Sequence, residues 1–150
     1  MRRARLLALP AVLWLAAASG AAAAADFRSV GPGPAILYDA PAQKSRKLYV
    51  APAGMPVEIV FANGEWTRVR DAAGDLSWIE SRALSPHRTF VVEVAQLSAR
   101  SAANDQAPVI FTAARGALLE LAEPISSAWI KVRHRDGETG YVKAAEVWGD

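Results

Sequence analysis

Apolar and polar residues alternate along most of the chain in short runs, and Gly, Pro, Asn and Asp separate these runs. The clearest case is the segment 55–61, in which Val57, Ile59 and Phe61 fall on one face. A period of two predicts β-strands, and the dipeptide Asn63-Gly64 that follows predicts a two-residue turn into the next strand. No internal segment has a convincing helical period. The pattern therefore predicts an all-β protein.

One part of this pattern occurs twice. The segment 66–79, WTRVRDAAGDLSWI, aligns without a gap to the segment 129–142, WIKVRHRDGETGYV. Each copy reads as a strand opened by Trp, a tight turn that carries Gly, and a second strand in which an aromatic residue precedes a β-branched one. This is the pattern of a β-hairpin.

Earlier segments recur as well. A strand is expected at 35–38, and the overlapping segment 36–40 corresponds to 96–100, so the offset between the copies grows from about 60 to 62 and then 63. Repetition of short strands and turns at this period favours two small β domains. We place them at 26–86 and 87–150.

The first 25 residues have the features of an export leader. A short cationic start precedes the apolar run Leu6 to Ala18, and Ala23 to Ala25 supply the small residues that signal peptidases recognise. We expect cleavage after Ala25 and a periplasmic or secreted mature protein. The alternative is an uncleaved anchor, because 6–25 is nearly long enough to span a bilayer.

Removal of this leader changes the charge of the chain. The whole sequence has 17 Lys and Arg against 15 Asp and Glu, and three of the Arg residues belong to the leader. The mature protein therefore carries a net charge of about −1 with the two signs mixed, which disfavours nucleic-acid binding. The chain has no Cys, so we expect neither disulfides nor a lipid anchor, and no membrane insertion after cleavage.

The second copy carries an ordered set of motifs: Leu97-Ser98-Ala99-Arg100, Gly116, Trp129-Ile130-Lys131-Val132 and Gly140-Tyr141-Val142. This order resembles the bacterial SH3-like domain family, whose members often follow an export leader and often occur in tandem. The first copy departs from it, with Ser77-Trp78-Ile79 in place of the Gly-Tyr-Val motif.

The resemblance covers essentially all of 27–150. It implies a five-stranded, strongly bent antiparallel barrel in each copy, and Arg88-Thr89-Phe90-Val91-Val92 is similar to the connector between such repeats in proteobacterial members. It also implies binding of cell-wall material or peptides, although a fold alone does not supply an activity.

Strand geometry selects a candidate ligand-binding set, because alternate residues of a strand share a face. Trp and cations fall together on the outer face of each copy, and the aromatic before each β-branched core residue points outward. The set is Trp66, Arg68, Arg70, Trp78, Trp129, Lys131, Arg133 and Tyr141. Such faces can stack on a sugar or amide plane while a cation pairs with a carboxylate, and peptidoglycan offers both. The alternative is that these Trp residues are half-buried beneath loops beside solvated Arg side chains.

No pattern indicates catalysis or metal binding. His87 and His134 are the only His residues, and neither belongs to a nucleophile elbow or a recognisable ligand spacing. Glu58 and Glu120 recur at equivalent positions but are expected to be solvated. We therefore expect a non-catalytic binding protein without cofactors, which recognises peptidoglycan or, alternatively, acts as an adaptor for another envelope protein.

Two further features complete the expectations. The segment 35–39 is similar to the aromatic-bearing strand of a proline-rich ligand groove, but 143–147 and 80–84 lack the Pro and Tyr of its other wall. A polyproline ligand is therefore disfavoured.

Trp148 is expected to pack against a barrel or against the other copy.

Overall fold

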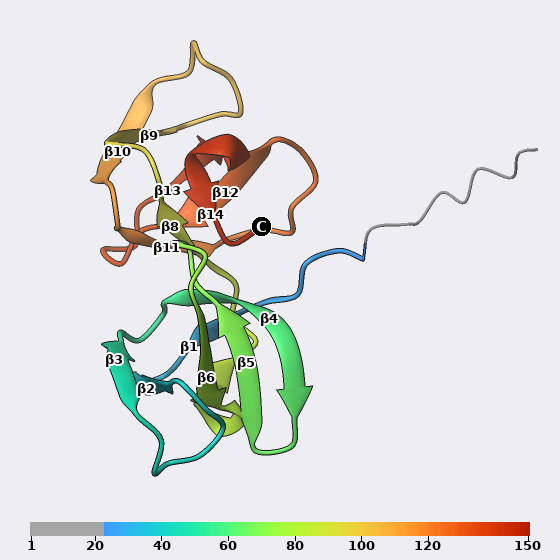
Figure 1. Ribbon diagram of the computed structural model, residues 1–150. Helices are drawn as coiled ribbons and strands as arrows, with labels where there is room; N and C mark the ends of the chain where they lie inside the picture. Colours follow the sequence, from blue (N-terminus) through green and yellow to red (C-terminus); the bar gives the residue numbers. More distant parts are fainter. Residues whose placement is uncertain (1–22) are drawn as a thin grey trace, which may run out of the picture.

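The computed structural model describes residues 23–150 and forms two β units in tandem (Figure 1). The first unit contains β1 (Phe27–Val30), β2 (Ala35–Tyr38), β3 (Lys47–Ala51), β4 (Pro56–Asn63), β5 (Trp66–Arg70), β6 (Leu76–Glu80), the 3-10 turn η1 (Ser81–Ala83) and β7 (Leu84–Ser85). The second contains β8 (Thr89–Val92), β9 (Gln96–Arg100), β10 (Val109–Ala114), β11 (Leu118–Leu121), β12 (Trp129–Arg133), β13 (Thr139–Lys143), the 3-10 turn η2 (Ala144–Glu146) and β14 (Val147–Trp148).

The two units have the same topology. The first sheet has the strand order β3-β2-β6-β5-β4-β1-β7, and the second has β10-β9-β13-β12-β11-β8-β14, so each strand has a counterpart in the other unit. The predicted all-β duplication is confirmed. Each sheet has seven strands rather than the five expected, in part because β7 and β14 are two-residue strands that pair with β1 and β8. Strands this short leave no periodic signal in a sequence.

Cross-strand pairs show which positions of the two units correspond. Tyr38 pairs with Trp78 in the first sheet, and Arg100 pairs with Tyr141 in the second. The strand β9 therefore corresponds to β2 at an offset of 62 positions. The predicted offset of about 60 for this strand is therefore wrong by two positions. The sequence alone does not show which residues of the neighbouring strand stand opposite β2 and β9.

A β-bulge in β4 reverses the expected alternation. The ladder with β5 skips Val60 between Ile59 and Phe61, and the extra residue turns the following side chains to the opposite face. Phe61 is consequently 54% exposed, whereas Val57 is fully buried. The prediction that Phe61 falls on the same face as Val57 and Ile59 is wrong for this reason.

The turn after β4 lies one residue later than predicted. Asn63 pairs with Trp66, so Gly64 and Glu65 form the two-residue connection. Gly64 has φ of 61°, in the left-handed region that glycine adopts without steric cost. The hairpin itself is as expected.

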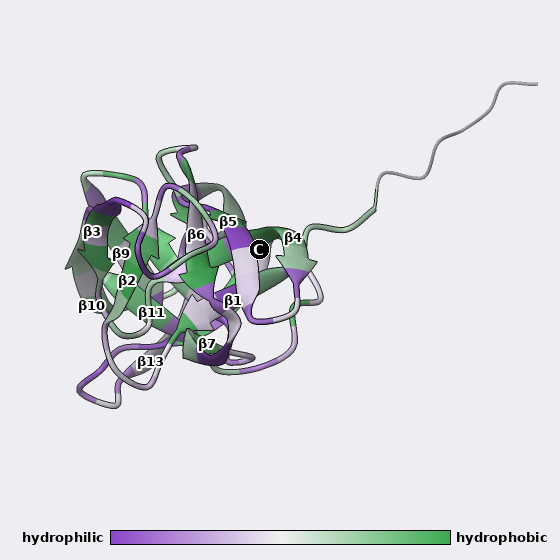
Figure 2. Ribbon diagram, turned by 60° about the horizontal axis from the view of Figure 1, so that its bottom comes forward, coloured by the Kyte–Doolittle hydropathy of each residue, from purple (hydrophilic) through white to green (hydrophobic). Residues whose placement is uncertain are grey.

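Each unit buries its own apolar cluster. The first comprises Val30, Leu37, Ala51, Val57, Val69 and Ile79. The second comprises Phe90, Val92, Leu97, Ala99, Phe111, Ala113, Leu119, Ile130, Val132, Val142 and Val147. Figure 2 shows green, apolar residues mostly on the strands and many purple, hydrophilic residues in the connecting loops. Burial of each large side chain stabilises the fold by about 1.5–3 kcal/mol.

The segment 88–92 belongs to the second sheet. Its strand β8 pairs with β11 and β14 and contributes Phe90 and Val92 to the second core. The expectation that this segment is a connector between the repeats is therefore wrong. The residues between β7 and β8, 86–88, make the connection instead.

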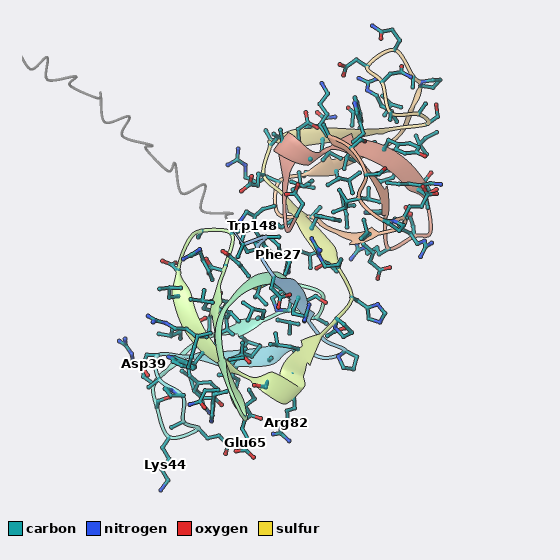
Figure 3. All side chains as sticks on the ribbon, turned by 90° about the vertical axis from the view of Figure 1, so that its right-hand side faces the viewer. Phe27, Asp39, Lys44, Glu65, Arg82 and Trp148 are labelled. Carbon is teal, nitrogen blue, oxygen red and sulfur yellow. The ribbon has the colours of Figure 1, made fainter. Side chains whose placement is uncertain are left out.

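Side chains of both units meet where the units join. Trp148 packs edge-on against Phe27, with ring centroids 5.0 Å apart (Figure 3). The Thr89 hydroxyl donates a hydrogen bond to the Gly54 carbonyl at 2.7 Å, also across the joint. The prediction that Trp148 packs against a barrel or the other copy is confirmed.

The predicted leader, apart from its last three residues, lies outside the described residues. Among residues 23–150, no helix is long and apolar enough to cross a bilayer.

Candidate ligand-binding faces

The first candidate face lies across β4, β5 and β6. Arg68 stands between Phe61 on one neighbouring strand and Trp78 on the other, and we call these three residues the first aromatic–cation row. The rings of Phe61 and Trp78 pack edge-on with centroids 6.3 Å apart. Arg68 is exposed and makes no ion pair with any residue in 23–150. The row therefore carries an exposed cation without an ion-pair partner, on the strand between the strands that hold the two rings.

The corresponding row of the second unit consists of Lys131 and Tyr141, which are cross-strand partners on β12 and β13. The Lys131 ammonium lies 5.7 Å from the centroid of the Tyr141 ring. It also forms an ion pair with Glu123, and this hydrogen bond raises the pKa of Lys131. The cation of the second row is therefore already occupied by two partners within the chain.

The two remaining arginines of the predicted set are Arg70 and Arg133. Here the cation of the first unit is paired within the chain, and the cation of the second unit is not. Arg70 forms an ion pair with Glu58 at 2.8 Å, so this cation is occupied. Its counterpart Arg133 stands opposite Glu120 in the sheet but makes no ion pair within 23–150. Glu58 points away from the core as expected, but it is partly covered by its Arg partner rather than freely solvated.

Trp66 lines a depression of about 440 Å³ at the end of the first unit. The polar residues around it are Gln43, Glu65, Glu80 and Arg82. Glu65 and Arg82 lie at the end of this unit away from the joint (Figure 3). The ring of Trp66 is half-buried and packs edge-on against buried Tyr38, with centroids 5.3 Å apart. The ring is thus held by the core on one side and open to the depression on another.

Glu80 organises the polar wall of this depression. It accepts a hydrogen bond from the Gln43 amide at 2.8 Å and another from the Arg82 guanidinium at 2.5 Å. The bond from Arg82, followed by that from Gln43, lowers the pKa of Glu80. Sequence reasoning missed these wall residues, because Gln43 reaches Glu80 from a loop that lies 37 positions earlier.

Trp129 has a different environment. It pairs across the sheet with Lys143, whose ammonium lies 5.6 Å from the centroid of the indole ring. Lys143 forms an ion pair with Asp105 at 2.8 Å, and this contact lowers the pKa of Asp105. The equivalent partner of Trp66 in the first unit is Glu80, which cannot cover an indole in this way.

All eight residues of the predicted set lie on the outward side of their strands. Their neighbours in sequence, Thr67, Val69, Ile130 and Val132, are buried, as the period of two requires. The structure does not gather the eight residues into one site, since four belong to each unit. Within 23–150, no group of three or more His, Asp or Glu side chains converges on a possible metal position.

Similarity to known proteins identifies the family of this chain. No curated protein matches the chain. Among solved structures, NlpC2 from Trichomonas vaginalis is 14% identical with a TM-score of 0.38, and the match covers 84% of this chain and 48% of that one. NlpC1 from the same organism is 13% identical with a TM-score of 0.38, covering 93% of this chain and 51% of that one. The chain thus spans about half the length of these structures.

The family model for the bacterial SH3 domain matches the chain twice, at residues 31–86 and 93–149. The two matches fall on the two sheets and include both Trp hairpins. The chain therefore belongs to the bacterial SH3 domain family, as a tandem pair of such domains.

Proposed function

We propose that this chain is a non-catalytic, exported binding protein that recognises peptidoglycan through the outward aromatic and cationic residues of its Trp hairpins. Membership of the bacterial SH3 family supports a binding role. The leader pattern at 1–25 supports export to the periplasm or beyond. Peptidoglycan presents sugar rings and peptide carboxylates side by side, which are the two chemistries that these faces match.

The observation that carries this proposal is the first aromatic–cation row. Arg68 is exposed and unpaired within 23–150, and it stands between Phe61 and Trp78. A guanidinium can hold a carboxylate with two parallel hydrogen bonds, and flanking aromatic rings reduce the competition from water. A stem peptide therefore supplies the anion, and Trp66 on the same strand supplies a surface for the attached sugar.

Binding to purified sacculi tests this proposal. The mature protein is mixed with sacculi, and the retained fraction is measured for the native chain and for Arg68→Glu. We expect Arg68→Glu to reduce retention at least fivefold, because it replaces the free cation with a charge that repels carboxylates. Arg115→Glu is the matched control, since Arg115 is also exposed and lies in the turn between β10 and β11.

Two results decide against the proposal. Retention of the native chain no greater than that of an unrelated protein of similar charge removes it. Equal loss in Arg68→Glu and Arg115→Glu removes the specific role of the first row, because the effect then follows net charge alone.

A second function, as an adaptor for another envelope protein, is favoured by the edge strands. The strand β3 at one end of the first sheet exposes Leu48, Tyr49 and Val50, and the equivalent β10 exposes Val109 and Ile110. Unpaired edges with apolar side chains are sites where an extended segment of another protein can add a strand. Crosslinking from β3 in cells, followed by mass spectrometry, should yield one dominant protein partner. A diffuse set of products counts against this function.

A further inference from the structure

The aromatic residues of the two units differ in what covers them. In the second unit both outward rings have a lysine of the same chain over them, Lys143 over Trp129 and Lys131 over Tyr141. Each lysine is fixed in turn by a carboxylate, Asp105 in the first case and Glu123 in the second. A ligand that stacks on either ring has to displace an ammonium and break an ion pair.

The first unit lacks these covers. No cation lies over the ring of Trp66 or Trp78 among residues 23–150. Glu80 occupies the position that corresponds to Lys143, and it is turned to Gln43 and Arg82 instead. The indole of Trp66 consequently borders an open depression, and its orientation is already fixed by Tyr38. Because the ring is already held in one orientation, a ligand that stacks on it does not have to order it, and the entropic cost of binding is small.

The charge around this depression indicates the chemistry of its ligand. Two carboxylates, Glu65 and Glu80, face one guanidinium, Arg82, so the wall carries one excess negative charge. Such a wall repels an anionic group. It offers hydrogen-bond acceptors from the carboxylates and donors from Gln43 and Arg82 beside an aromatic face, which suits a neutral ring rich in hydroxyl and amide groups.

We propose that the depression beside Trp66 is a glycan-binding subsite, and that only the first unit has one, because the lysines of the second unit close its equivalent surface. This assignment rests on the proposed function and names the part of the ligand that the Trp66 end receives. The sugar ring stacks on the indole of Trp66, and its hydroxyl and amide groups form hydrogen bonds with Glu80, Gln43 and Arg82.

Glu80 and Lys143 provide a reciprocal test, because they stand opposite Trp66 and Trp129 at the same place in the two sheets. The probe is a linear tetramer of N-acetylglucosamine, titrated into ¹⁵N-labelled mature protein. The indole N–H signals of Trp66 and Trp129 are followed by NMR. We expect a saturable shift of the Trp66 signal and no shift of the Trp129 signal.

Two variants test whether the residue opposite each Trp controls tetramer binding. Glu80→Lys places a cation opposite Trp66, as in the second unit, and should weaken tetramer binding at least tenfold. Lys143→Glu removes the cover of Trp129 and should leave binding at Trp66 unchanged. Both positions are at the surface, and circular dichroism spectra that match the native chain confirm that each variant is folded. Unchanged affinity in Glu80→Lys, or equal loss in both variants, overturns the assignment.

Sacculus binding of the native chain, measured in parallel, separates this assignment from the proposed function. A Trp66 shift without retention on sacculi supports the glycan subsite and removes peptidoglycan recognition. Retention without a Trp66 shift, or with a shift of Trp129, overturns the subsite and leaves peptidoglycan recognition standing. Absence of both removes both.

Discussion

Trp148 in the last strand of the second unit packs edge-on against Phe27 in the first strand of the first unit, with ring centroids 5.0 Å apart. The Arg88 guanidinium lies 5.5 Å from the centroid of the same Phe27 ring and donates a hydrogen bond to the Gly149 carbonyl. Domains of about 60 residues bury a smaller share of their surface on folding than larger domains do. Contact between the units therefore adds apolar burial that neither unit has by itself.

The first prediction concerns this contact. Trp148→Ala should lower the free energy of unfolding by about 2 kcal/mol, because a half-buried aromatic loses its packing. In a double-mutant cycle with Phe27→Leu, the coupling between the two rings should be about 0.5–1.5 kcal/mol. Urea denaturation of the four proteins measures both quantities. Additive effects of the two substitutions contradict the contact.

The second prediction concerns Gly140, where the first unit has Ser77. A Cβ atom at Gly140 would lie 2.9 Å from the Cβ of Ala99 and 3.2 Å from the Arg100 carbonyl oxygen. Gly140→Ser should therefore destabilise the protein by about 1–3 kcal/mol through overpacking. The reciprocal variant Ser77→Gly should cost about 0.5–1 kcal/mol, the usual penalty for glycine in a strand. Thermal unfolding of both variants gives the comparison, and a neutral Gly140→Ser contradicts the close approach of β13 and β9.

The third prediction tests the bulge in β4. Phe61→Ser should change the free energy of unfolding by less than about 1 kcal/mol, because Phe61 is 54% exposed. Val57→Ala, at a fully buried position of the same strand, should cost about 2–3 kcal/mol. Guanidinium denaturation measures both. A larger cost at Phe61 than at Val57 would mean that the strand continues without the bulge.

The fourth prediction concerns stability at alkaline pH. The Tyr49 hydroxyl donates a hydrogen bond to Asp71 at 2.9 Å, and burial together with this carboxylate raises the pKa of Tyr49 above its ordinary value of 10.0. Above about pH 10 the unfolded chain loses the phenolic proton while the folded chain keeps it, so this contribution to stability falls as pH rises.

Tyr49→Phe supplies the control for the alkaline effect. Unfolding free energies measured between pH 8 and pH 11 should fall more steeply for the native chain than for Tyr49→Phe. Parallel curves for the two proteins contradict the assignment to Tyr49.

Much of the fold follows from local patterns in the sequence. The Trp hairpins, the strand Ala35–Tyr38 and the outward direction of Trp66 and Trp129 follow from alternation and turn residues alone. The bulge at Val60 does not follow from such patterns. The alternation of side chains in β4 looks regular in the sequence, and only the register with β5 shows the extra residue. The offset between β2 and β9 was missed for the same reason.

The candidate site was predicted only in part. The outward Trp residues were found, but the polar wall beside Trp66 was not, because Gln43 belongs to a loop with no periodic signal. Whether a lysine covers the indole ring also depends on the residue opposite it, which is Glu80 for Trp66 and Lys143 for Trp129. Both members of each pair belong to one hairpin, but the register of its two strands decides which residues face each other.

The amino-acid sequence by itself determined the fold class and the tandem repeat, because strand periodicity, turn residues and duplication are properties of neighbouring positions. Only the tertiary structure decided which aromatic rings stay open, where the depression beside Trp66 lies, and how Trp148 meets Phe27. These features depend on strand register and on contacts between segments far apart in the chain, and packing selects them only once the sheets have formed.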